Sequence, residues 1–105
     1  MDGKTTVGYL QKYIASKDYH PELKETYFLK LSEEVGELAQ AMRKDRLRRP
    51  GDGIKGTIDE ELWDIMYYLV ALANCYGIDL EEAIRDKEAI NNVKYNTGKV
   101  FEENR

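Results

Sequence analysis

The residues best suited to chemistry in this sequence are carboxylates placed where helix cores are expected. Residues 62–73 read LWDIMYYLVALA, a segment that is apolar on nearly every side and holds one charge, Asp64. An isolated carboxylate buried there would be expensive. Glu61 lies three residues before Asp64, and Glu34 and Glu37 share that spacing, so each pair projects from one side of its helix. Two facing helices would bring these four carboxylates together.

The angular position of the glutamates on their helix separates them. At about 100° per residue, with Leu31 at the centre of the apolar stripe, Glu34 falls about 60° away and Glu37 about 120° away. The stripe is expected to contain residues within about 40° of Leu31: Tyr27, Val35, Leu38 and Met42. Glu34 therefore borders the core, whereas Glu33 points away from it. An acidic run is usually a solvated face, and this interpretation is favoured for Glu33 but not for Glu34 or Asp64.

Four converging carboxylates suit a hard divalent cation. Mg²⁺, or Mn²⁺ as the second choice, takes oxygen ligands and keeps waters for substrate phosphates. Such a cation also removes the cost of burying the carboxylates. A di-iron bundle is the competing metal site, but it requires two Glu-x-x-His elements. The only histidine, His20, is far from both carboxylate pairs, so that alternative fails.

A row of polar residues is expected on the last helix. With Leu80 as the reference, Lys87 and Asn91 fall within about 20° of the centre of an apolar sector, and Tyr95 continues the line. A lysine can extend out of such a sector and an asparagine can bond to backbone, so either alone has a structural explanation. Together, a cation and two hydrogen-bonding groups facing a carboxylate cluster would suit a phosphorylated ligand with a polar sugar or base.

Helices are the only elements that the hydrophobic periodicity predicts. Pro21 suits a first helical turn, Gly77 a helix end, and Asp79 with Glu82 a capping box. These signals predict an all-α fold, with helices over residues 5–16, about 20–43, about 58–75 and 80–95. The last ten residues show no periodicity.

Length and composition limit the class of protein. The 105 residues carry a net charge of −4, which favours one domain over residues 1–105 and argues against binding a nucleic-acid polymer. Cys75 is the single cysteine, and the N-terminus lacks the apolar run of a signal peptide, so a cytoplasmic protein is expected. Residues 65–73, the longest apolar stretch, are far fewer than the ~20 needed to cross a bilayer, so no membrane association is expected.

The two carboxylate pairs together form a recognisable two-part motif. Glu33-Glu34-x-x-Glu37, a connector of 23 residues, and Glu61-x-x-Asp64 resemble the signature of the MazG-like all-α nucleotide pyrophosphohydrolases. The segments LSEEVGELAQAMRK and EELWDIMYYLVALANCYGIDLEEAI look like that family's two core helices, and the resemblance covers about residues 20–95. It implies a four-helix MazG-like bundle that associates into a homodimer or homotetramer.

The resemblance also implies an activity. It indicates magnesium-dependent hydrolysis of a ribo- or deoxyribonucleoside triphosphate to the monophosphate and pyrophosphate, for house-cleaning or control of the nucleotide pool. The metal ligands implied by the motif are Glu34, Glu37, Glu61 and Asp64. Glu33 would serve as a base or near a second metal. The substrate-binding residues implied are Lys87, Asn91 and Tyr95, with His20 either stacking on the base or serving only to start a helix.

Two alternatives to this activity stay open. A phosphoribosyl-ATP pyrophosphatase shares the architecture and the type of bond cleaved, and a non-catalytic helical module could use the same acidic cluster to bind metal and nucleotide. Trp63 departs from the family pattern, where a small residue often precedes the motif aspartate. With Tyr67 and Tyr68 it is expected to widen the apolar face of its helix, which partner subunits would cover.

Overall fold

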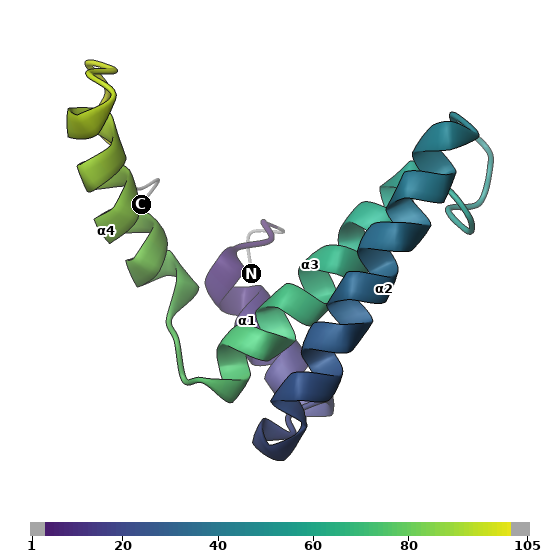
Figure 1. The fold of residues 1–105 in the computed structure, drawn as a ribbon, viewed down its shortest axis with the longest axis horizontal. Coiled ribbons are helices and arrows are strands. Elements are labelled where there is room, and N and C mark those ends of the chain that lie inside the picture. The colour runs from purple at the N-terminus through teal and green to yellow at the C-terminus, as the bar shows by residue number, and fades with distance from the viewer. Residues whose placement is uncertain (1–3, 102–105) are drawn as a thin grey trace.

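The structure, a computed structural model, describes residues 4–101 and contains only helices in that range (Figure 1). The elements are α1 (Val7–Lys17), a short 3₁₀ turn η1 (Pro21–Leu23), α2 (Lys24–Arg43), α3 (Ile58–Cys75) and α4 (Leu80–Lys94). The predicted all-α fold is confirmed. Residues 96–101 are irregular, and the remainder of the last ten residues lies outside the described range.

Side-chain caps set where three of the four helices begin. Thr6, Thr57 and Asp79 each accept a hydrogen bond from the backbone N–H three residues further on. The cap at Thr6 starts α1 two residues later than the periodicity predicted, while the predicted cap at Asp79 is confirmed. Gly77, with a φ of 66°, adopts the left-handed conformation that ends α3.

An antiparallel hairpin of α2 and α3 forms the body of the molecule (Figure 1). The residues that α2 buries or half-buries against α3 recur at alternating steps of four and three: Tyr27, Leu31, Glu34, Leu38 and Ala41. On α3 the corresponding series is Glu61, Asp64, Tyr68, Ala71 and Cys75. These two series are called the seam below. Val35 and Met42, expected in the core, are 52% and 59% exposed because the alternating steps leave them beside the seam.

Helix α1 crosses α3 and closes a small core around Ile14 and Tyr27. Trp63, Tyr67 and Tyr68 pack against this core. The rings expected to be covered by partner subunits are instead partly covered within the chain, because Tyr67 donates to Asp18 at the end of α1 and the Tyr68 ring lies 6.4 Å from the Tyr27 ring of α2. The outward face instead consists of three half-exposed residues: Leu62, Met66 and Leu69.

Helix α4 leads away from the α2–α3 hairpin and contains no buried residue (Figure 1). Polar contacts with α1 hold its first turn. The Gly8 N–H donates to Glu81 Oε2 at 2.6 Å, and the Gln11 side chain donates to the Ile78 carbonyl at 2.8 Å and accepts from the Leu80 N–H at 3.0 Å. These contacts are called the α1–α4 junction below. The apolar sector expected around Lys87 and Asn91 is thus left open by this chain.

None of the helices in residues 4–101 combines the length and the apolar character that a membrane span requires.

Candidate metal centre

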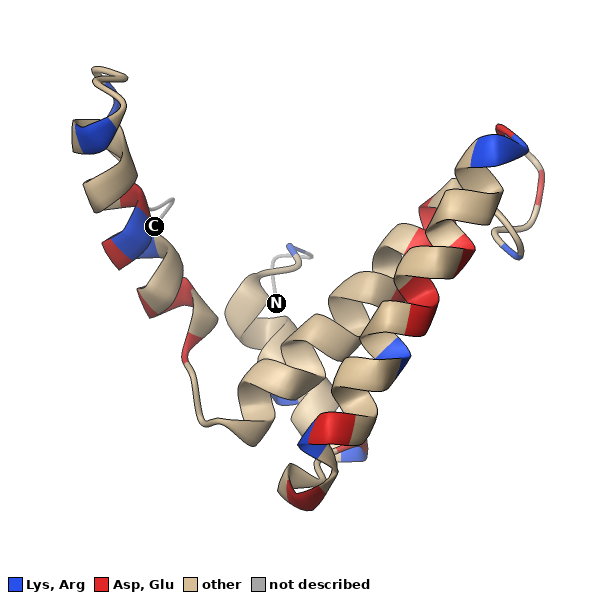
Figure 2. Ribbon diagram, in the orientation of Figure 1, with Lys and Arg blue, Asp and Glu red and all other residues tan. Residues whose placement is uncertain are grey.

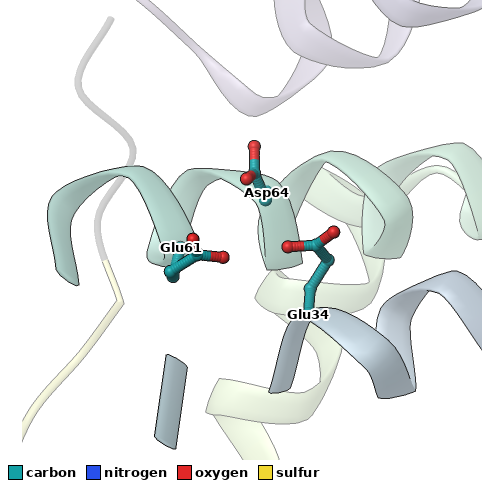
Figure 3. Close-up of side chains that lie close together, drawn as sticks. All are labelled: Glu34, Glu61 and Asp64. Atoms are coloured by element: carbon teal, nitrogen blue, oxygen red, sulfur yellow. The ribbon is translucent and has the colours of Figure 1, made fainter. Parts of the chain in front are cut away.

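Three carboxylates from the two hairpin helices meet in the seam (Figure 3). Glu34 of α2 faces Glu61 and Asp64 of α3, and one oxygen from each lies within 4.8 Å of the others. These three residues are called the acidic triad. In Figure 2 most of the acidic positions along the ribbon of the hairpin lie in the half towards the connecting loop. The triad therefore replaces apolar contacts at consecutive positions of a helix–helix interface.

Burial makes this arrangement electrostatically unfavourable. Glu61 is 8% exposed, and its Oε2 atom has no hydrogen-bond partner among residues 4–101. Burial, followed by the neighbouring Glu34 carboxylate, raises the pKa of Glu61 to about 7. Burial, followed by the charges of Glu34 and Glu60, also raises the pKa of Asp64. Burial and neighbouring like charges both disfavour ionisation of these carboxyl groups, and a bound cation would offset both effects.

The donor set fits a divalent metal ion. All three groups offer hard oxygen ligands, which Mg²⁺ and Mn²⁺ prefer. A buried acceptor normally has a hydrogen-bond partner, and the Oε2 atom of Glu61 has none among the described residues. A metal ligand whose metal is not bound would have the same feature. A cation bound to the triad would satisfy that oxygen and offset the mutual repulsion of the carboxylates.

The other acidic candidates lie outside the triad. Glu37 is exposed and does not belong to the group that meets within 4.8 Å. It lies about 120° around α2 from the centre of the apolar stripe, compared with about 60° for Glu34, so it falls outside the seam. Glu33 is also exposed, and its carboxylate pairs with Lys30 at 3.5 Å. The hairpin thus brings together three of the four predicted metal ligands.

The structure does not bring the candidate substrate-binding residues to the triad within one chain. Lys87 and Asn91 lie on α4, which diverges from the hairpin (Figure 1), and Tyr95 directly follows it. Asn91 donates to Glu88 at 3.0 Å, and Tyr95 is 65% exposed. His20 lies at the start of η1, where its ring is near acidic side chains of the same segment.

A cleft of about 390 Å³ adjoins the triad on the side of α1. Its lining combines two triad carboxylates, three aromatic rings and two residues from the end of α1: Glu34, Asp64, Trp63, Tyr67, Tyr68, Lys17 and Asp18. This space is called the triad cleft. It joins a charged end, suited to a metal and phosphates, to an aromatic wall.

Two acidic residues of this region were not predicted from the sequence. Asp18 accepts hydrogen bonds from the hydroxyls of Tyr27 and Tyr67, which lie far from it in sequence, so no local pattern signals it. Glu60 accepts from the Gly56 N–H at 2.8 Å and pairs with Lys55 at 3.6 Å. The spacing Thr-x-x-Glu at the start of α3 is the signal that would have identified Glu60 as a capping residue.

Comparison with known proteins is consistent with this arrangement. Residues 22–92 match the MazG nucleotide pyrophosphohydrolase domain. Two crystal structures of iMazG from Vibrio DAT 722 are similar to this chain. One covers 84% of this chain with 45% identity and a TM-score of 0.78, and the other covers 88% with 47% identity and a TM-score of 0.80. Each match spans 99% of the solved chain. The uncharacterized protein YpjD of Bacillus subtilis (strain 168) is 36% identical over 73 residues, and the match spans 66% of its length.

Proposed function

Because the chain belongs to the MazG nucleotide pyrophosphohydrolase family, we propose that it hydrolyses a nucleoside triphosphate to the monophosphate and pyrophosphate with the help of Mg²⁺. One observation carries this proposal. Three carboxylates from two helices meet in the seam, and one of their oxygens is buried without a partner among the described residues. Nothing in the packing of the hairpin requires those charges, so we attribute them to a ligand.

The residues of this chain have separate parts in the proposed reaction. Glu34, Glu61 and Asp64 would hold the metal ion, with Glu37 joining them as its exposed side chain turns towards the phosphates. When bound, the ion supplies neutralisation of triphosphate charge and a more acidic water. The rings of Trp63, Tyr67 and Tyr68 would form the wall against which the nucleoside lies.

The position of α4 favours completion of the site by a second copy of the chain. Lys87 and Asn91 belong to a helix that leads away from its own hairpin (Figure 1), and Tyr95 follows the last residue of that helix. We propose that these residues contact the substrate bound to a partner's triad, in a homodimer or a homotetramer. The role of Glu33 as a base stays a prediction, since its carboxylate is exposed and paired with Lys30.

The test is pyrophosphate release from a panel of ordinary and modified ribo- and deoxyribonucleoside triphosphates, with Mg²⁺ or Mn²⁺ and with phosphoribosyl-ATP included. Asp64→Asn should lower turnover by about 100-fold or more, because it removes a charged ligand and keeps the side-chain volume. Glu25→Gln, an exposed position at the start of α2, is the matched control and should keep wild-type turnover.

Each outcome of the panel separates the candidate functions. Release from nucleoside triphosphates that is lost in Asp64→Asn supports the proposal. Release from phosphoribosyl-ATP alone would reassign the substrate. Metal-dependent nucleotide binding with no release from any compound, in a folded protein, would point to a non-catalytic module.

A further inference from the structure

Asp18 is the one carboxylate of the triad cleft that belongs to neither half of the acidic motif. It follows α1 directly and lines the cleft together with Lys17. Its Oδ1 atom accepts from the Tyr27 hydroxyl at 2.6 Å, and its Oδ2 atom accepts from the Tyr67 hydroxyl at 2.8 Å. Two donors on two helices therefore fix the orientation of this side chain.

Asp18 remains a charged acceptor in this setting. The hydrogen bond from Tyr27 outweighs burial and, with the bond from Tyr67, lowers the pKa of the Asp18 carboxyl. An ionised carboxylate accepts hydrogen bonds and donates none, and each of its oxygens has more than one lone pair. The side chain of Asp18 is 28% exposed and lines the triad cleft, and His20 Nε2 lies 3.9 Å from its Oδ1 atom.

The surroundings of Asp18 suit a planar ring. Tyr67 lies edge-on to both Trp63 and Tyr68, with ring centroids 6.1 Å and 5.3 Å apart. Lys17 Nζ lies 5.2 Å from the centre of the Tyr67 ring. A nucleotide whose phosphates lie at the triad would have its base at this aromatic wall, within the part of the cleft that Asp18 lines.

We propose that Asp18 determines base specificity by accepting a hydrogen bond from an exocyclic amino group of the base. This inference rests on the proposed function, which places a nucleotide in the triad cleft. Cytosine and adenine carry such an amino group, whereas uracil and hypoxanthine carry a carbonyl oxygen at the same ring position. A carbonyl facing the fixed carboxylate would set acceptor against acceptor, which discriminates strongly in a site built for a donor.

Binding of the product monophosphates tests the inference without relying on turnover. Trp63 lines the cleft and is the single tryptophan of the sequence, so its fluorescence reports on occupation of this cleft. We expect dCMP to bind about tenfold or more tightly than dUMP in the presence of Mg²⁺, the ratio expected for one charge-assisted hydrogen bond. AMP and IMP form the matching purine pair.

Asp18→Asn should reduce the dCMP to dUMP ratio to about threefold or less, because an amide can donate to the uracil carbonyl. Glu25→Gln, which also removes a negative charge but lies outside the cleft, should keep the wild-type ratio. Tyr67→Phe is a second variant that keeps the ring and the charge of Asp18 but removes one of the bonds that orient it. It should lower the ratio and serves as the test if Asp18→Asn fails to fold.

Equal binding of dCMP and dUMP to the wild-type protein, or an unchanged ratio in Asp18→Asn or in a folded Tyr67→Phe variant, would overturn the role of Asp18. Failure of the proposed function gives a different result. Base-selective quenching of Trp63 without pyrophosphate release from any triphosphate would contradict the proposed function and leave the role of Asp18 in place.

Discussion

Glu61 is the residue of the seam whose burial costs the most stability. Its side chain is buried in the seam, one of its oxygens has no partner among the described residues, and two further carboxylates face it. Placing a carboxylate in such surroundings costs more than the same position occupied by an apolar residue. The cost falls when the carboxyl takes up a proton or when a cation binds.

The pH dependence of stability should report this cost directly. The pKa of Glu61 rises from 4.5 to about 7 on folding, so the folded chain binds the proton more tightly than the unfolded chain. Stability should therefore be greatest below pH 4.5 for this group and should be lost as the pH rises through about 7. In EDTA we expect a lower melting temperature at pH 8 than at pH 5.5. The corresponding loss of unfolding free energy should be at most about 3 kcal/mol.

Two controls identify the source of that dependence. Glu61→Gln should flatten it, and Mg²⁺ at pH 8 should restore the stability that deprotonation removes. The lowered pKa of Asp18 acts in the opposite direction, but only in the acidic range below its ordinary value of 3.8. A metal-free protein that is more stable at pH 8 than at pH 5.5 would contradict the assignment of the shift to Glu61.

At the scale of elements, the alternating spacing of the seam decides which charges are buried. Glu34 belongs to the seam series of α2, between Leu31 and Leu38. Its neighbour Glu33 lies outside the seam. Replacing Glu34 with leucine should continue the apolar seam. In EDTA at pH 8, Glu34→Leu should raise the unfolding free energy by about 1–3 kcal/mol. With Mg²⁺ present, the same substitution should abolish turnover.

The matched control for this prediction is Glu33→Leu. The same substitution at an exposed position should give little or no stabilisation, because no facing helix covers it. Chemical denaturation of both variants provides the measurement. Destabilisation of Glu34→Leu relative to the wild type would show that the acidic triad contributes to the fold without a metal.

The α1–α4 junction makes a separate prediction. Gln11 bonds to the carbonyl of Ile78, the N–H of Leu80 and the side-chain oxygen of Asn74. Gln11→Ala should cost about 1–3 kcal/mol, because several of these partners lose a bond at once. It should also speed hydrogen exchange of the α4 amides, since α4 has no buried residue to hold it.

Lys12→Ala is the control for Gln11→Ala. Lys12 is the next residue of α1 and is exposed, so its removal should change neither stability nor exchange by a comparable amount. Unchanged exchange in α4 after Gln11→Ala would mean that the turn from Tyr76 to Asp79 fixes the direction of α4 without help from α1.

The sequence predicted the helices well because their ends depend on local signals. Asp79 and Gly77 specify a helix start and a helix end within a few residues, and α3 has the predicted bounds. Partners brought together from distant positions were not predictable. Asp18 meets Tyr67, 49 residues away, and Trp63 packs against a core that includes Ile14 of α1. The side-chain bonds of Gln11 at the first turn of α4 likewise join residues 63 to 69 positions apart in the sequence.

The molecule as a whole is open. Its radius of gyration is 16.2 Å, compared with about 13 Å for a compact chain of this length. Its accessible surface is 8210 Å², roughly 2,000 Å² more than a compact monomer of this mass would expose. The excess exceeds what one partner contributes to a standard interface, about 800 Å². These values favour the proposed homo-oligomer.

The outward face of α3 is the part of the surface expected to lie between copies. Leu62, Met66 and Leu69 recur along it and are each about half exposed. Leu69→Lys should shift the protein from oligomer to monomer, measured as molar mass by light scattering after gel filtration. Leu47→Lys, in the loop between α2 and α3 where the side chain is 60% exposed, should leave the mass unchanged. A wild-type mass in Leu69→Lys would exclude this face.

The hairpin geometry of the acidic triad also bears on the order of folding. Glu34 and Glu61 face each other across one connection, so this pairing closes a much shorter loop than the docking of α1 against α4. Contacts of low sequence separation tend to form in the transition state. We therefore expect the acidic triad to form before α4 docks. In stopped-flow measurements, Mg²⁺ should then accelerate refolding as well as slow unfolding.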